Sequence, residues 1–210
     1  VRFGGRDELD FMWQHLAGSE RVIDPSISNV IDIFILTRQY LIQMNRYIAG
    51  VDSNPPETPS SADLAFQFQM LLKSRMISDT VVLHPVKIKL LFGNLAEPEY
   101  QAKFKLIRRP SASMTIDQLR TAVLNIILDY FAIENWDLGQ PFYATELFAK
   151  IHTELGQELS SVVLTPQQAD SSFGDLFVVT PDKHELLRPA ISLSDIIAVD
   201  GFDKATLKQK

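Results

Sequence analysis

The stretch that decides the fold is VKIKLLFGNLAEPEYQAKFKLI, which spans residues 86–107. In both of its halves, inward apolar residues alternate with residues that would face outward, which is the pattern of a strand with one buried and one exposed face. The residues between the halves, 93–98, include a glycine and a proline and are typical of a turn. The stretch therefore predicts a β-hairpin of two strands at 86–92 and 102–107.

Four lysines occupy the predicted exposed face of this hairpin: Lys87, Lys89, Lys103 and Lys105. A turn centred near residue 96 would place Lys87 opposite Lys105 and Lys89 opposite Lys103, and like charges directly opposite each other destabilise a strand pair. We therefore expect this lysine face to meet carboxylates, either of this chain or of an acidic partner. The alternative is that the lysines only solubilise an exposed sheet face.

The rest of the chain alternates between helix and strand patterns. Further strands are expected at 30–36, 161–164 and 176–179. Helices are expected at 7–16, after Thr37, after Ser60, at 115–131 and at 145–155, because apolar residues recur there at helical spacing. Thr37 can cap its helix, Ser60 and Asp63 can open the next one, and Thr115 and Gln118 form a capping box. The order strand, helix, two strands, helix, strand predicts an α+β fold of the split βαβ type. We expect a single sheet covered by helices, with additional N-terminal helices and a C-terminal strand pair.

The chain is expected to form a single domain over residues 1–185, followed by a C-terminal extension over residues 186–210. Prolines make residues 51–60 unsuitable for a helix or a central strand. A domain linker is one interpretation of this stretch, but about fifty residues are few for a separate domain before it. We interpret it as a long loop inside the domain. Apolar runs fall well short of the roughly 18 residues that a membrane span needs, so we expect a soluble protein.

Composition and motifs argue against most kinds of chemistry. The 210 residues include no cysteine, which excludes a thiolate zinc site, an iron–sulfur cluster and a cysteine nucleophile. His15, His84, His152 and His184 are scattered without the spacing of metal ligands. Glycine-rich phosphate loops and the serine-hydrolase motif are missing from the sequence. We therefore expect no catalytic, cofactor-binding or metal-binding residues, and no enzyme activity. The alternative is a small enzyme or ligand-binding domain whose site is built from dispersed His and carboxylates.

Nucleic-acid binding is not expected either. The formal net charge is −6, whereas a nucleic-acid-binding domain is usually basic. A basic sheet face that binds RNA also needs exposed aromatic side chains to stack on bases. Phe92 and Phe104 have the inward parity of the predicted strands, so they would not supply these contacts.

The predicted helix at 115–131 carries two apolar surfaces. The broad one, which should pack on the sheet, contains Ile116, Leu119, Ala122, Val123, Ile126, Ile127 and Tyr130. Leu124, Leu128 and Phe131 instead fall within the polar arc, at spacings i, i+4 and i+7. Three apolar residues in register form a stripe that something must cover. Either another helix of this chain covers it, such as the N-terminal one with Trp13, or a second copy or neighbouring protein does.

One segment resembles a known family. It contains LGQPFYATEL at 138–147, AKI at 149–151, Gly156, and VVL at 162–164. It resembles the C-terminal region of the baseplate J-like family. The members of this family are baseplate wedge proteins of contractile-tailed bacteriophages. In that family a helix that starts near a Ser/Thr-x-Leu/Ile motif is followed by a glycine and by a strand that closes the sheet. The order of the predicted elements agrees over roughly residues 20–180, and departs at 51–60, in the helix before it, and after about 185.

The resemblance implies a virion structural protein, a subunit of the tail baseplate wedge that acts through protein–protein assembly and has no cofactor. Its partners would be other wedge proteins and a second copy of itself, without nucleic acid or membrane. Its location would be the tail baseplate of the virion, after assembly in the host cytoplasm. The residues expected at the partner interface are Leu124, Leu128, Phe131, Lys87, Lys89, Lys103 and Lys105.

Overall fold

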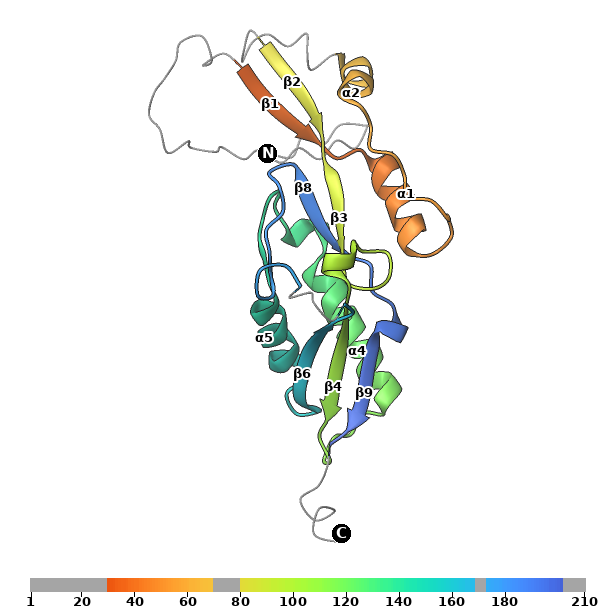
Figure 1. Cartoon of the computed structure of the whole chain (residues 1–210), viewed down its shortest axis with the longest axis vertical. Helices are drawn as coiled ribbons and strands as arrows, with labels where there is room; N and C mark the ends of the chain where they lie inside the picture. The colour runs from red at the N-terminus through yellow and green to blue at the C-terminus, as the bar shows by residue number, and fades with distance from the viewer. Residues whose placement is uncertain (1–29, 70–79, 169–172, 202–210) are drawn as a thin grey trace, which may run out of the picture. The chain divides into compact units, whose positions relative to one another are not determined.

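The computed structural model describes residues 30–69, 80–168 and 173–201, and their helices and strands form an α+β protein (Figure 1). The predicted fold class is therefore confirmed. The chain divides into two compact units, residues 1–87 and 88–210, where the sequence had predicted one domain over 1–185. The helix predicted at 7–16 lies outside the described residues.

A two-stranded parallel sheet forms the centre of the first unit. Strand β1 (Val30–Ile35) pairs with β2 (Thr80–Pro85). Helix α1 (Arg38–Ile48) follows β1, and helix α2 (Ser61–Gln67) precedes β2 in the chain. A small apolar core joins β1, α2 and β2 and consists of Ile35, Leu64 and Leu83, with Ile33 and Phe68 packed against it. The strand predicted at 30–36 is confirmed.

Side-chain caps explain why these helices begin where they do. The Thr37 hydroxyl accepts a hydrogen bond from the backbone N–H of Tyr40 at 3.3 Å, which satisfies one free donor of α1. Ser60 and Asp63 form a reciprocal capping box at the start of α2. Residues 51–60, between the two helices, contain no helix or strand, as their prolines predicted.

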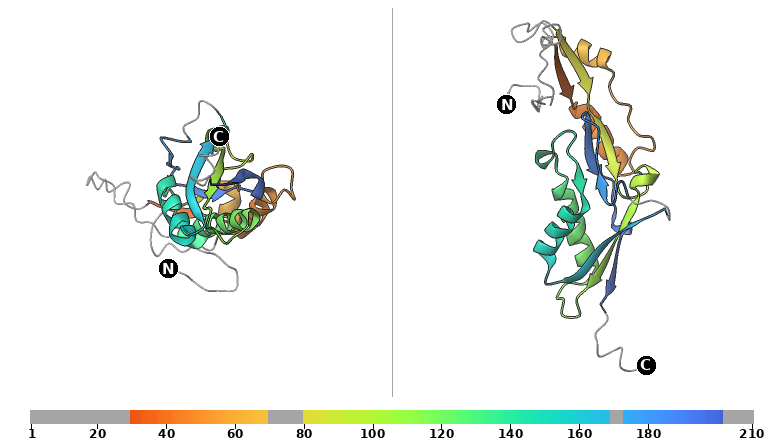
Figure 2. Two further views of the ribbon diagram at one scale, coloured as in Figure 1. Left: turned by 90° about the horizontal axis from the view of Figure 1, so that it is seen from below. Right: turned by 60° about the vertical axis from the view of Figure 1, so that its left-hand side comes forward.

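The second unit contains a three-stranded sheet in the order β6-β4-β9. The central strand β4 (Ala102–Arg108) is antiparallel to β6 (Leu159–Pro166) and parallel to β9 (Ile196–Asp200). Helices α4 (Ile116–Tyr130) and α5 (Ala144–Leu155) lie together on one side of this sheet (Figures 1 and 2). The buried side chains of β4 are Ala102, Phe104 and Leu106, in the alternation that the sequence predicted.

Aromatic rings fill the core of this unit. Among the described residues of this unit, five phenylalanines are fully buried: Phe92, Phe104, Phe131, Phe142 and Phe173. The ring centroid of Phe92 lies 5.0 Å from that of Phe104 and 5.4 Å from that of Phe173. Because these residues come from distant parts of the sequence, the aromatic core joins β4, α4 and the connecting segments.

The prediction of a single sheet is wrong. Strand β3 (Lys87–Leu91) pairs with β8 (Glu185–Pro189) and not with β4, while β1 pairs only with β2. The strands predicted at 30–36, 86–92 and 102–107 therefore belong to three different sheets. At the end of β3, Phe92 (φ 65°) and Gly93 (φ 57°) adopt left-handed conformations. These redirect the chain, so that residues 86–107 do not form the predicted hairpin.

The C-terminal part also differs from the prediction. Strand β7 (Val178–Val179) pairs with β5 (Phe142–Tyr143) and not with β6, so the predicted pairing of 176–179 with 161–164 is wrong. Residues 186–201 were expected to be an extension, but they include most of β8 and all of β9. Ile196 of β9 is buried in the core. Residues 202–210 lie outside the described part.

A carboxylate fixes the loop that leads into α4. Glu158, just before β6, accepts hydrogen bonds from the Met114 backbone N–H at 2.9 Å and from the Ser113 hydroxyl at 2.8 Å. These bonds stabilise the charged carboxylate, the Met114 bond most strongly, and lower the pKa of Glu158. Thr115 then caps α4 and forms with Gln118 the capping box predicted from the sequence.

Candidate interaction surface

Helices α4 and α5 lie on one side of the β6-β4-β9 sheet (Figure 2). The opposite face carries exposed and half-buried side chains from all three strands. We call it the outer sheet face. Its members are Lys103, Lys105, Ile107, Ser161, Val163, Thr165, Ile197 and Val199. They share the parity opposite to the buried residues of each strand, so they lie on one side of the sheet.

The strand register brings these residues together in rows. Lys105 lies between Val163 and Ile197, and Ile107 lies between Ser161 and Val199. Side chains on facing positions of neighbouring strands are roughly 5 Å apart, so the rows form a continuous surface.

Half of this surface is apolar and exposed. The exposed fractions are 39% for Ile107, 48% for Val163, 41% for Ile197 and 51% for Val199. A single exposed aliphatic residue needs no explanation, but four in adjacent positions form a patch. An uncovered face of an antiparallel or mixed sheet is ordinarily polar, so this composition makes the outer sheet face a candidate interaction surface.

The charge of the outer sheet face is positive. Its only ionisable members are Lys103 and Lys105, and neither takes part in an ion pair within the described residues. The carboxylate of Asp200, at the end of β9, has the opposite parity and pairs with Arg108 at 3.0 Å. Among the described residues, the apolar patch therefore adjoins two lysines that have no ion-pair partner.

The other two predicted lysines lie elsewhere. Lys89 on β3 is largely buried, with its ammonium 3.7 Å from the Glu185 carboxylate and 4.6 Å from the centre of the Tyr100 ring. Burial lowers the pKa of Lys89, but the Tyr100 hydroxyl and the charge of Glu185 outweigh it and raise the pKa above its usual value. Lys87 is exposed at the start of β3. The carboxylate that was expected to meet Lys89 is therefore supplied by Glu185 of this chain.

The predicted lysine pairs are wrong. Lys103 lies opposite Thr165, and Lys105 lies opposite Val163 and Ile197, so neither faces Lys87 or Lys89. The reason is that β4 pairs with β6 and β9 on its two sides, which leaves no edge for β3. The outward direction of Lys103 and Lys105 was nevertheless predicted correctly from the alternation.

The predicted stripe on α4 separates into three different environments. Phe131 is fully buried, and its ring stacks on that of Trp136 at 5.0 Å. Its assignment to a partner interface is therefore wrong, because the segment after α4 folds back over it. Leu124 is partly buried, while Leu128 is 45% exposed. A partner contact at Leu128 stays a prediction. The N-terminal helix with Trp13, which was the other element expected to cover the stripe, lies outside the described residues.

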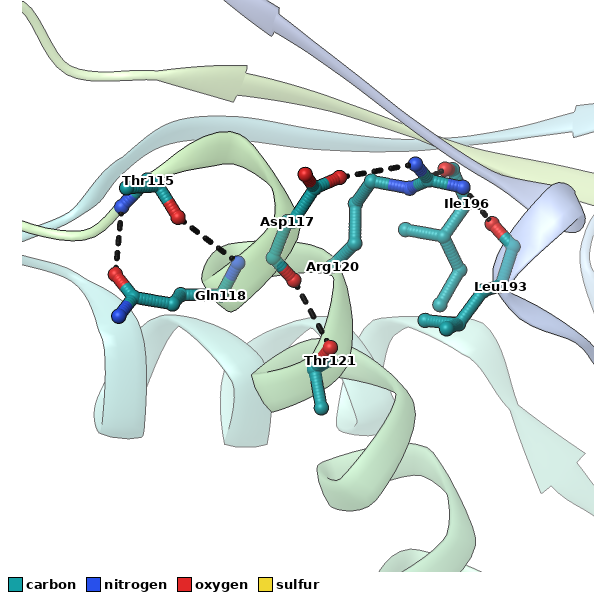
Figure 3. A network of polar contacts seen from close by, with 7 residues as sticks. All are labelled: Thr115, Asp117, Gln118, Arg120, Thr121, Leu193 and Ile196. Atoms are coloured by element: carbon teal, nitrogen blue, oxygen red, sulfur yellow. Dashed lines mark hydrogen bonds and ion pairs between the residues drawn. The ribbon is translucent and has the colours of Figure 1, made fainter.

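Arg120 of α4 holds the strand that carries part of the outer sheet face (Figure 3). Its Nε donates to the carbonyl oxygen of Ile196 at 2.8 Å, and its Nη2 donates to that of Leu193. Its Nη1 lies 3.4 Å from the Asp117 carboxylate. Sequence patterns near Arg120 give no sign of this role, because the partner carbonyls are more than seventy residues away.

The first unit contains a histidine–carboxylate contact. His84 Nε2 lies 2.8 Å from Asp32 Oδ1, and the His84 ring stacks on Phe34 with centroids 5.3 Å apart. A carboxylate can orient a catalytic imidazole in this way. Here both side chains are exposed on the β1-β2 sheet, as in an ordinary surface pair. Within the ranges 30–69, 80–168 and 173–201, no group of three or more potential metal ligands occurs.

Comparison with known proteins adds no relative. Neither a scan against models of protein families nor a search of curated proteins returned a match. In the part of the chain that the structure describes, every helix is too short or too polar to cross a membrane. The function must therefore be argued from the surfaces of the molecule.

Proposed function

We propose that this chain is a virion structural protein, a subunit of the tail baseplate wedge of a contractile-tailed bacteriophage, and that it acts through protein–protein contacts. The observation that carries an assembly role is the outer sheet face. Four exposed aliphatic residues there adjoin two lysines that form no ion pair with any residue the structure describes. Exposed apolar patches with polar neighbours are characteristic of protein–protein contact sites.

The baseplate assignment is supported by the segment that resembles the baseplate J-like family. Helix α5, Gly156 and strand β6 follow one another in the order that this resemblance implies. Strand β6 also contributes Val163 to the outer sheet face. The other predicted strands belong to separate sheets, so their order no longer supports the resemblance. The baseplate assignment therefore depends on residues 138–164.

Deletion of the gene from the phage that encodes this chain tests the proposal. We expect lysates without infectious particles, in which electron microscopy shows free heads and tails without complete baseplates. Supplying the gene in trans should restore infectivity. Neighbouring genes should encode sheath, tube and other baseplate components. Normal contractile tails in the deletion lysate, or a genome without tail genes around this one, would refute the proposal.

A further inference from the structure

We propose that the outer sheet face binds one acidic amphipathic helix of another assembly protein. This inference rests on the proposed function, because it assigns a partner chemistry to the same surface. It goes beyond that function because it specifies the secondary structure and the charge of the partner segment, and because it assigns one helix to the face.

The dimensions of the face fit one helix. Neighbouring strands are about 4.8 Å apart, so the axes of β6 and β9 are separated by roughly 10 Å. An α-helix with its side chains is about 10–12 Å across. Along β4, the distance from Lys103 to Ile107 is about 13 Å, which corresponds to between two and three helical turns. A single short helix, aligned with the strands, would cover all eight residues.

The charges specify the chemistry of that helix. Lys105 lies between Val163 and Ile197, so any apolar surface that covers these two residues also removes water from the Lys105 ammonium. Burying an unpaired ammonium is costly, and a carboxylate brought by the partner would offset the cost. Lys103 lies one row away on the same strand and offers a second positive charge. The partner helix should therefore carry apolar residues over the aliphatic patch and Asp or Glu over the lysines.

A second copy of this chain does not meet these requirements. In a two-fold contact between identical chains, the same surface faces itself. The outer sheet face contains two lysines and no carboxylate, so self-association would bring lysines together inside a desolvated contact. Like charges placed against each other in an interface cost several kcal/mol, which favours a different, acidic partner.

Site-specific photo-crosslinking in the full chain tests the inference. A photoreactive amino acid is placed at Ile107 during phage infection, virions are purified, and the crosslinked peptide is sequenced by mass spectrometry. We expect a segment of another virion protein in which apolar residues recur at i, i+3, i+4 and i+7 and carboxylates flank them. In the same particles, Lys103→Glu with Lys105→Glu should reduce the crosslink about tenfold or more. The matched control is Lys183→Glu, which reverses an exposed lysine outside the outer sheet face and should leave the crosslink unchanged.

The outcomes separate this inference from the proposed function. Crosslinking to a second copy, to a segment without carboxylates, or to nothing in particles that contain the chain would overturn the inference and leave the structural role intact. Absence of the chain from purified virions would overturn both. If the double Glu variant fails to fold, as judged by circular dichroism, Lys103→Gln with Lys105→Gln replaces it. An unchanged crosslink in a folded double variant would also refute the inference.

Discussion

Replacing Phe131 with alanine should destabilise the 88–210 unit strongly, whereas replacing Leu128 should not. The two residues belong to the same apolar stripe in the sequence, three positions apart on α4 and its C-terminal cap. The structure buries Phe131 completely and leaves 45% of Leu128 exposed. The pair therefore tests whether the division between core and surface along this helix is correct.

The expected cost follows from the surroundings of the Phe131 ring. Its centroid lies 5.0 Å from Trp136, 5.3 Å from Phe142 and 6.0 Å from Phe92. Truncating a buried phenylalanine to alanine costs about 3–5 kcal/mol, and the lost ring pairs favour the upper half of that range. For a unit of this size, a loss of about 4 kcal/mol lowers the melting temperature by roughly 15 °C. The free energy of unfolding of Leu128→Ala should stay within about 0.5 kcal/mol of wild type, because Leu128 is exposed.

Urea and thermal unfolding, followed by circular dichroism, measure both variants against the wild-type chain. Size-exclusion chromatography with light scattering on Leu128→Asp adds the mass of the assembly, since a smaller assembly with unchanged stability would identify Leu128 as a contact. A Phe131→Ala variant within about 1 kcal/mol of wild type would refute the assigned burial. So would a Leu128→Ala variant that unfolds as early as Phe131→Ala.

Three further substitutions test individual contacts. Gly93→Ala should cost at least about 2 kcal/mol in urea unfolding, because the new Cβ would lie 2.1 Å from the Ala190 carbonyl oxygen at a positive φ. The hydrogen bond from Met114 lowers the pKa of Glu158. The Glu158 carboxylate therefore stabilises the folded state above about pH 4.3, and this contribution is lost as the pH falls through the folded-state pKa. The difference in melting temperature between wild type and Glu158→Gln should therefore shrink between pH 5 and pH 3; a constant difference would contradict this. Arg120→Met should cost about 1–3 kcal/mol in thermal unfolding, and an unchanged midpoint would show that its bonds to backbone carbonyls contribute nothing.

Local features of the fold were predictable from the sequence. The caps at Thr37, Ser60 and Thr115 depend on residues within three positions of each other, and the structure confirms all three. The alternation in β4 also needs only neighbouring residues, and it correctly separated the buried Phe104 from the outward Lys105. These features are set by short-range sterics and hydrogen bonding, which a single sequence displays directly.

Strand pairing was not predictable in the same way. An alternating strand fits any edge that offers a matching apolar face, so residues 86–107 were compatible with a hairpin as well as with the observed sheets. Phe92 and Gly93 adopt positive φ between β3 and β4, and a phenylalanine gives little warning of such a conformation. Strand β9 pairs with β4 across some ninety residues, a separation that local periodicity does not bridge.

The candidate site shows the same limit. Lys103 and Lys105 were recognised from their alternation, but Val163, Ile197 and Val199 were missed. The sequence IIAVD at 196–200 does alternate, which was the available sign of β9, yet it lay in the region interpreted as an extension. Only the register, which places Ile197 beside Lys105, turns scattered apolar residues into a surface.

The composition of the outer sheet face suits a partner-specific contact better than a general solubilising role. Lysines that only prevent sheet aggregation work best among other polar residues, because an aliphatic patch beside them still favours association. On this face, two lysines in the central strand are combined with aliphatic residues on both neighbouring strands. That arrangement disfavours contact with another copy and with basic or neutral apolar surfaces. An acidic partner with apolar residues would bind both the lysines and the aliphatic patch. The contact that we propose on this face would therefore select its partner by charge.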